Sequence, residues 1–165
     1  MIERVKTSGV SRAASHAAAR RILAVDYGQK RIGLALSDEL GVTAQPLSTL
    51  VRTNRRNDLR RVREICREHS VGLIIVGYPL HMTGAAGEMA NQAERFSARL
   101  GKELGLPVEL VDERLTTWQA EQIAAETQSS RNKSRSLDDV AAAVLLRDYL
   151  ERISARTQSP AGAKV

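Results

Sequence analysis

Ile22-Leu23-Ala24-Val25-Asp26-Tyr27-Gly28-Gln29-Lys30-Arg31-Ile32-Gly33 is the stretch that decides the fold. An apolar run of strand length ends at Asp26, and a turn that contains Gly28 leads into a second apolar run over residues 32–37. A carboxylate at the end of a strand adds nothing to the core, but it can hold a metal ion or a phosphate. At this point a turn acid that caps the hairpin is an equally good interpretation.

The composition favours a polyanionic partner. The chain has 165 residues, enough for one domain with a proper core, and its net charge of +6 with a pI of about 10.0 favours nucleic acid. Cys66 is the single cysteine, which excludes an internal disulfide and fits a reducing cytoplasm. We find no secretory signal and no apolar run long enough for a membrane span, so a cytoplasmic protein is expected.

The chain divides into a central domain and two tails. Residues 1–20 are rich in Ala, Ser and Arg, and they are predicted to form a basic, disordered N-terminal arm. Residues 154–165 have a similar character and are predicted to form a flexible tail. The domain itself is expected over residues 21–153.

Strand and helix patterns alternate within this domain. The predicted strands are 22–26, 32–37, 43–51, 72–77 and 108–111, and the predicted helices are 55–68, 86–104, 116–126 and 137–153. Pro46 marks the third strand as an edge strand, and the strand at 108–111 is predicted to be buried. The fold class is therefore α/β, with a mixed five-stranded sheet (a three-strand meander followed by β-α-β-α-β) and helices on both faces.

Acidic residues follow the strands that should run parallel. The strands that end at Asp26, Gly77 and Val111 are expected to share one edge of the sheet, the usual location of a site in α/β proteins. Asp112 and Glu113 leave the last strand in opposite directions, so only one of them can easily face a shared site. Glu113 is favoured and Asp112 is given a supporting role, with the choice between them open.

A third acidic pair opens the last predicted helix. Acids in the first turn of a helix are favoured by its dipole and need no other role. Ser136 and Asp139 have the spacing of a capping box, which gives Asp139 a local role. Asp138 instead shares a stripe with the apolar residues that should face the sheet, so Asp138 is favoured for the site and Asp139 is the alternative.

Carboxylates that converge on one point repel each other unless a cation lies among them. Oxygen ligands suit Mg²⁺ or Mn²⁺, and two such ions about 4 Å apart can activate a water and stabilise the leaving oxygen of a phosphodiester. The polar loop before the last helix carries Arg131, Lys133 and Arg135, which could clamp a phosphate backbone. The many arginines from Arg52 to Arg67 lie on one helix and its approach, and a solvated helix face is the simplest interpretation of the helix arginines.

Four motifs together resemble the YqgF family, also called RuvX, of pre-16S rRNA nucleases and Holliday junction resolvase-like proteins. The resemblance covers about residues 21–151. It is carried by Val25-Asp26-Tyr27-Gly28 with Lys30-Arg31-Ile32-Gly33, by Val76-Gly77-Tyr78-Pro79-Leu80 with Met82 and Gly84, by Asp112-Glu113-Arg114-Leu115-Thr116-Thr117, and by Leu137-Asp138 to Ala141-Ala142 with Tyr149-Leu150.

The resemblance implies an RNase H-like fold and a metal-dependent nuclease. It assigns Asp26, Glu113 and Asp138 as catalytic residues and metal ligands. Of the cations in these motifs, Lys30, Arg31 and Arg114 are predicted to contact substrate, together with the loop cations Arg131, Lys133 and Arg135. In the family's usual glycine-rich loop, Thr83 here replaces an acid and His81 an amide, which leaves the acidic triad intact.

The predicted function is a cytoplasmic endonuclease that acts on structured nucleic acid. Its substrate is the 5′ end of pre-16S rRNA, a Holliday junction, or both. Resolving a four-way junction takes two cuts and hence a symmetric homodimer. Cys66 could cross-link such a dimer on oxidation, but its place on an apolar stripe favours a buried thiol. The competing hypothesis is a ribosome-assembly factor that binds nucleic acid without cutting it.

Overall fold

The structure, a computed structural model, describes residues 20–79, 87–112 and 137–158. The elements are β1 (Arg21–Tyr27), β2 (Arg31–Ser37), β3 (Ala44–Pro46), β4 (Leu50–Val51), α1 (Arg55–Glu68), β5 (Val71–Tyr78), α2 (Glu88–Leu104), β6 (Val108–Asp112) and α4 (Leu137–Gln158). The predicted helix at 116–126 lies outside the described residues. None of the described helices has the length and apolar character needed to cross a membrane.

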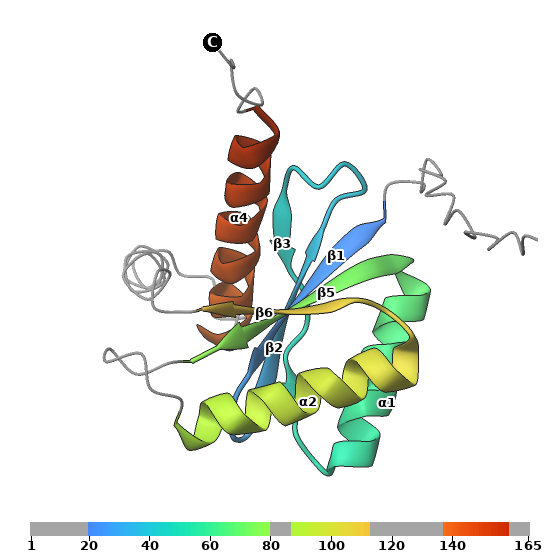
Figure 1. Ribbon diagram of the computed structural model, residues 1–165. Helices are drawn as coiled ribbons and strands as arrows, with labels where there is room; N and C mark the ends of the chain where they lie inside the picture. The colour runs from blue at the N-terminus through green and yellow to red at the C-terminus, as the bar shows by residue number, and fades with distance from the viewer. Residues whose placement is uncertain (1–19, 80–86, 113–136, 159–165) are drawn as a thin grey trace, which may run out of the picture.

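A mixed sheet forms the centre of the molecule, as predicted. The strand order is β3-β2-β1-β5-β6, with β1 antiparallel to β2 and parallel to β5, and β5 parallel to β6. Helix α4 covers one face of this sheet, and α1 and α2 cover the other (Figure 1). The carboxyl ends of β1, β5 and β6 therefore lie at one edge, where the sequence predicted the site.

The predicted third strand, residues 43–51, is two short strands. β3 and β4 both pair with β2, but the pairing stops after Pro46 and resumes at Leu50. Proline has no amide hydrogen to continue the ladder, and the next residue, Leu47, donates its amide to the carbonyl of Leu34. In the described part of the chain the sheet consequently has six strands where the sequence predicted five, and Pro46 lies on an edge strand as expected.

β6 is an edge strand. The sequence predicted that this strand would be buried, and that prediction is wrong. It pairs only with β5, so one of its sides has no neighbouring strand in the described part of the sheet. Glu109 and Leu110 are exposed, Leu110 by 41%, whereas Val111 is buried. The short apolar run resembled a covered strand because periodicity alone does not distinguish a central strand from an edge strand.

Alternating side chains of β1 build the two halves of the core. Leu23, Val25 and Tyr27 belong to the cluster under α1 and α2, and Ile22 and Ala24 belong to the cluster under α4. Successive side chains of a strand point to opposite faces, so Asp26 is the next residue on the α4 face. β1 is covered on both faces and hydrogen-bonded on both edges.

The helices begin and end close to the predicted positions. α1 has the predicted bounds, 55–68, because the Asn54 side chain accepts a hydrogen bond from the amide of Asn57 and caps its first turn. α2 begins two residues later than predicted, at Glu88, and ends at Leu104 as predicted, where the cap residue Gly105 has a left-handed φ of 64°. α4 continues to Gln158, so residues 154–158 of the predicted tail are helical.

Candidate nucleic-acid cleavage edge and an arginine pocket

Asp26 lies near the carboxyl end of the central strand β1, half-buried on the α4 face. Its partner in β2 is Gly33. On the other side Val25 pairs with Val76, so the following residue of β5, Gly77, lies beside Asp26. Neighbouring strands would normally place side chains about 5 Å away on the same face. Both neighbouring positions are glycines, so neither adjacent strand places a side chain beside the Asp26 carboxylate at this level.

The turn after Asp26 is closed by main-chain contacts. The amide of Gly28 donates to the carbonyl of Arg31 at 2.9 Å, and a Cβ on Gly28 would lie 2.7 Å from that oxygen. Arg52 holds the turn from outside: its Nη1 donates to the carbonyls of Gly28 at 2.8 Å and Gln29 at 3.0 Å. Lys30 and Arg31, two predicted substrate contacts, are exposed on this fixed turn beside the strand end.

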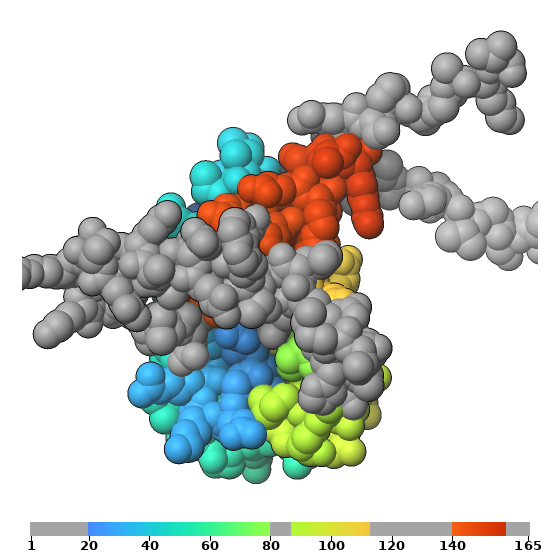
Figure 2. All heavy atoms as spheres, turned by 90° about the vertical axis from the view of Figure 1, so that its left-hand side faces the viewer, coloured from blue at the N-terminus to red at the C-terminus, as the bar shows by residue number. Residues whose placement is uncertain are grey.

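The carboxyl ends of the three parallel strands meet at one edge, together with the start of α4. Tyr78 of β5 pairs with Asp112 of β6, and the arrowheads of both strands lie beside the lower end of α4 (Figure 1). Figure 2 views this side of the molecule, with the residues of β1 and β2 (blue) beside the start of α2 (lime green) and below α4 (orange). Asp138 and Asp139 lie in the first turn of α4, as the sequence predicted.

Asp112 lies on the other face of the sheet from Asp26. Val108 packs against the cluster under α1 and α2, and Val111 belongs to the cluster under α4. Alternation along β6 therefore places Asp112 on the α1 and α2 face. Asp112 is thus poorly placed to share a ligand with Asp26, which agrees with the supporting role that the sequence gave it.

The remaining predicted site residues lie outside the described side chains. These are Glu113, Asp138 and Asp139 among the acids, and Arg114, Arg131, Lys133 and Arg135 among the cations. Among the residues that the structure describes, no three potential ligands form a metal site, and Asp26 is the member of the predicted triad that can be tested. The carboxylate oxygens of Asp26 are the donor type that suits a hard cation such as Mg²⁺.

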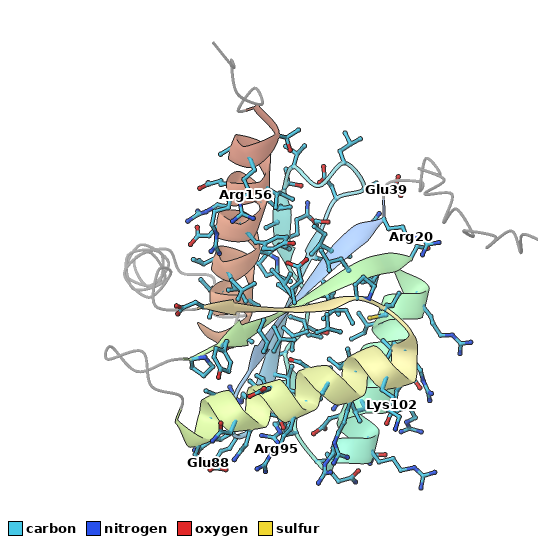
Figure 3. All side chains as sticks on the ribbon, viewed as in Figure 1. Arg20, Glu39, Glu88, Arg95, Lys102 and Arg156 are labelled. Carbon is cyan, nitrogen blue, oxygen red and sulfur yellow. The ribbon has the colours of Figure 1, made fainter. Side chains whose placement is uncertain are left out.

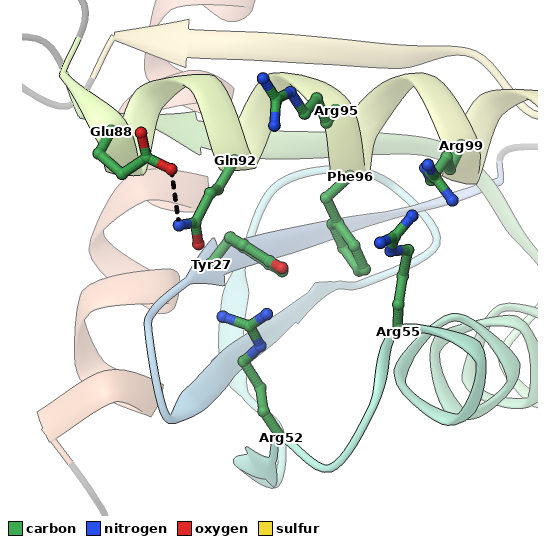
Figure 4. Close-up of a pocket in the computed structure, with 8 residues that line it drawn as sticks. All are labelled: Tyr27, Arg52, Arg55, Glu88, Gln92, Arg95, Phe96 and Arg99. Atoms are coloured by element: carbon green, nitrogen blue, oxygen red, sulfur yellow. Dashed lines mark hydrogen bonds between the residues drawn. The ribbon is translucent and has the colours of Figure 1, made fainter.

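A second feature of this edge was not predicted. A cavity of about 530 Å³ opens between α1 and α2, and we call it the arginine pocket; it is lined by Tyr27, Arg52, Arg55, Glu88, Gln92, Arg95, Phe96 and Arg99 (Figure 4). Glu88 and Arg95 come from the first half of α2, whereas Lys102 lies near its other end (Figure 3). The pocket lies on the sheet face opposite Asp26, because Tyr27 follows Asp26 in β1.

Besides its hydrogen bonds to the turn, Arg52 is fixed in the arginine pocket by an aromatic ring and a carboxylate. Its guanidinium lies over the Tyr27 ring, 4.4 Å from the ring centroid, and its Nε is 3.6 Å from Oδ2 of Asp58. Asp58 is only 2% exposed and also accepts a hydrogen bond from the amide of Thr53 at 3.1 Å. Tyr27 in turn stacks on Phe96 with a centroid distance of 4.5 Å. These contacts give the pocket a rigid floor.

The helix arginines Arg55, Arg56 and Arg60 are exposed, which agrees with a solvated helix face. Arg52, in the approach to the helix, is instead half-buried, and both Arg52 and Arg55 line the arginine pocket, which the sequence did not predict. A usable signal lay in α2, where Arg95 and Arg99 border Phe96, a residue of the predicted apolar stripe. Arg95 and Arg99 are exposed and Phe96 is buried, so these arginines lie at the rim of the core, where they can line a cavity.

Comparisons with known proteins agree with the fold and with the motifs. The model of the RuvX family, described as "Holliday junction resolvase", matches residues 20–152. A relative from Koribacter versatilis is 40% identical over 85% of this chain and 92% of its own length. Another from Geobacillus kaustophilus is 46% identical over 79% of this chain and 97% of its own length. Both are named "Putative pre-16S rRNA nuclease".

Solved structures share the fold at low sequence identity. RuvC of Thermus thermophilus in complex with a Holliday junction substrate has a TM-score of 0.55 and 18% identity, covering 81% of this chain and 96% of RuvC. The fowlpox virus resolvase in complex with Holliday junction DNA has a TM-score of 0.51 and 18% identity, covering 81% of this chain and 98% of the resolvase. These likenesses confirm the predicted RNase H-like α/β fold.

Proposed function

The chain belongs to the RuvX family, and from this premise we propose that it is a metal-dependent endonuclease that hydrolyses phosphodiester bonds of structured nucleic acid. The substrates we propose are the 5′ end of pre-16S rRNA, after the names of the relatives, and the four-way DNA junction, after the family description. The observation that carries the proposal is the position of Asp26, at the carboxyl end of the central strand and between two glycines.

We propose Asp26, Glu113 and Asp138 as the catalytic carboxylates and metal ligands. Asp112 lies on the other sheet face from Asp26, and the alternation of strand residues favours the next residue, Glu113, for the α4 face. The position of Asp138 in the first turn of α4, whose start lies near this edge of the sheet, supports its assignment (Figure 1). The capping-box spacing of Ser136 and Asp139 still favours Asp138 over its neighbour.

The cofactor we propose is Mg²⁺ or Mn²⁺, held by the oxygens of these carboxylates. Such a cation supplies the positive charge that lowers the pKa of a water and stabilises the leaving oxygen of a phosphodiester. The carboxylates bind it, and they are held by a sheet edge whose central strand is fixed on both sides. Lys30 and Arg31, exposed on the adjacent turn, would bind and orient the phosphates that flank the cut bond.

The remaining cations predicted to bind substrate are Arg114, Arg131, Lys133 and Arg135, and we propose the same role for them. Their sequence positions, directly after Glu113 and directly before Asp138, favour contacts to the backbone on either side of the metal ligands. A protein that acts on precursor rRNA works in the cytoplasm, which is the location we propose. On a four-way junction we propose a homodimer, because each copy would make one of the two cuts.

The decisive test replaces Asp26 by Asn, which keeps the shape of the side chain but removes its charge. Labelled four-way DNA junction, linear duplex DNA and a 16S precursor RNA fragment are incubated with Mg²⁺, Mn²⁺ or EDTA. We expect metal-dependent cleavage that falls roughly a thousandfold in Asp26→Asn, since a metal ion contributes several kcal/mol to phosphoryl transfer.

Asp112→Asn is the matched control, because it removes the same charge from the other face of the same edge. We expect it to retain most of the activity of the wild type. Binding of all three substrates without cleavage by wild type under any metal would overturn the nuclease and favour the assembly factor. Equal losses in Asp26→Asn and Asp112→Asn would contradict the assignment of Asp26.

A further inference from the structure

The arginine pocket concentrates positive charge that the described residues do not neutralise. Four guanidinium groups line it against one carboxylate, that of Glu88, whose Oε1 accepts a hydrogen bond from Nε2 of Gln92 at 3.1 Å. Arg52 is paired with Asp58. In the described part of the chain, no ion pair or hydrogen bond joins Arg55, Arg95 or Arg99 to a carboxylate.

These cations come from two helices that face each other across the cavity. Figure 4 shows Arg55, at the start of α1, and Arg99, on α2, reaching toward each other beside Phe96. Like charges held near each other raise the free energy of the folded protein unless an anion lies between them. The pocket therefore favours an anionic ligand, and planar guanidinium groups match the paired oxygens of a phosphate.

Size and surroundings point to a phosphate with its attached sugar rather than to a base. A cavity of about 530 Å³ has the volume of a small-ligand site. Tyr27 is 8% exposed and Phe96 3%, so neither ring offers a free face for a base to stack on. Burial is the main cause that raises the pKa of Tyr27, so its hydroxyl stays protonated at neutral pH and can donate to an oxygen.

We propose that the arginine pocket binds a backbone phosphate of the nucleic-acid substrate, away from the phosphate that is cut. That the ligand is nucleic acid rests on the proposed function. That the pocket suits a phosphate rests only on its arginines. Asp26 and Tyr27 are consecutive in β1, so the cleavage edge and the pocket lie on the two faces of one strand end. A nucleic-acid strand bound at both the cleavage edge and the arginine pocket would pass around the edge of the sheet, past the exposed turn that carries Lys30 and Arg31.

The test compares two double variants that remove equal charge from equivalent places. Arg55→Gln with Arg99→Gln removes one cation of the pocket from the first turn of α1 and one from the second half of α2. Arg56→Gln with Lys102→Gln removes exposed cations next to them that do not line the pocket. Thermal melting of both variants verifies that they fold.

Binding of the labelled junction and of the RNA fragment is measured in EDTA over a range of KCl concentrations. For the pocket variant we expect affinity about tenfold lower and a salt slope shallower by about one to two, since each phosphate contact contributes about one to that slope. The affinity and the salt slope of the control variant should differ much less from those of wild type. Equal effects in both variants would overturn the proposal, because the pocket would then contribute only to the general field.

A second arm separates a polymer ligand from a small one. Inorganic tripolyphosphate is titrated into wild type and both variants, with the side-chain N–H signals of arginine followed by NMR. Loss of tripolyphosphate binding in the pocket variant together with weaker nucleic-acid binding supports the proposal. Loss of tripolyphosphate binding with unchanged nucleic-acid binding would overturn it in favour of a site for a free phosphate compound. Neither arm requires cleavage, so failure of the proposed nuclease would not be mistaken for failure of the pocket.

Discussion

Asp26 and Tyr27 are consecutive residues of one strand, but their side chains serve two different sites on opposite faces of the sheet. The carboxylate of Asp26 lies on the α4 face between two glycines, and the ring of Tyr27 lies on the other face under Arg52. Each position requires its own residue type: an anion where a cation is to be held, and an aromatic ring where a guanidinium is to be supported. A swap of the two residues would damage both sites.

Cys66 provides a prediction at this scale. The thiol is 4% exposed, which agrees with the buried thiol inferred from the apolar stripe, and burial raises its pKa from 9.0 to about 11. The folded state therefore favours the neutral thiol. Its contribution to stability is fully present below about pH 9 and is lost as the pH rises through about 11.

Urea unfolding at pH 8 and pH 10.5 checks this prediction. Between the two pH values, the free energy of unfolding of wild type should fall by up to about 2 kcal/mol more than that of Cys66→Ala, because each pKa unit corresponds to about 1.4 kcal/mol. The native thiol should also react with a thiol reagent at pH 8 only after denaturant is added. Immediate reaction of the native protein would contradict its burial and revive the disulfide-linked dimer.

The sequence was sufficient to predict the position of Asp26 but not the burial of Asp58. Asp26 follows an apolar strand and precedes a glycine turn, so its position could be inferred. Asp58 lies within a helix rich in arginine, where nothing in the sequence distinguishes it from an exposed partner of those arginines. Its burial depends on Arg52 and on the amide of Thr53, which reach it only once the turn before α1 has formed.

At the scale of elements, α4 determines where Asp138 lies. Leu146 is fully buried, and it packs among the apolar side chains that α4 and the sheet share. Leu146→Ala should lower the free energy of unfolding by about 2–5 kcal/mol, the cost of a cavity in a core. Leu110→Ala on the exposed side of β6 should cost roughly 1 kcal/mol or less.

Chemical denaturation of the two leucine variants measures both costs. The comparison is sharp because the sequence predicted a buried strand for the region of Leu110, and the structure exposes that residue. Equal losses in the two variants would mean that β6 is covered in solution, for example by a second copy of the chain. A loss at Leu146 alone would support α4 as the element that completes the core.

The elements that sequence predicted well are those with strong local signals. Helix α1 has a capping asparagine and a clear apolar stripe, and its bounds were predicted to the residue. The strand predicted at 43–51 is divided in two at a proline. The strand predicted at 108–111 is confirmed as β6, but its predicted burial is wrong, because exposure depends on the place of the strand in the sheet order. Such information belongs to the assembled sheet and not to any one segment.

The whole molecule presents its two proposed sites from one edge of one sheet. The carboxyl ends of β1, β5 and β6 meet there, and the turn after β1 is exposed beside the start of α2 and below α4 (Figure 2). A chain with a net charge of +6 attracts nucleic acid over its whole surface. The proposed specific contacts, however, are confined to this edge, so the rest of the charge contributes mainly to the rate of encounter.

Stoichiometry gives a prediction for the whole molecule. A four-way junction has two equivalent cutting positions, so we expect two copies of the chain per junction and one copy per RNA fragment. The mass of each complex in EDTA, measured by light scattering after gel filtration, checks this. One copy per junction, with a single nick once metal is added, would contradict the homodimer and leave rRNA as the better substrate.

The position of β1 has a consequence for how this protein can adapt. A strand that is hydrogen-bonded on both edges and covered on both faces exchanges its amide hydrogens only when the entire domain opens. Asp26 and Tyr27 are thus attached to the most rigid part of the molecule. Evolution or design can retune substrate choice through the surrounding loops and helix faces, but an inserted or deleted residue in β1 would exchange the two faces and destroy both sites at once.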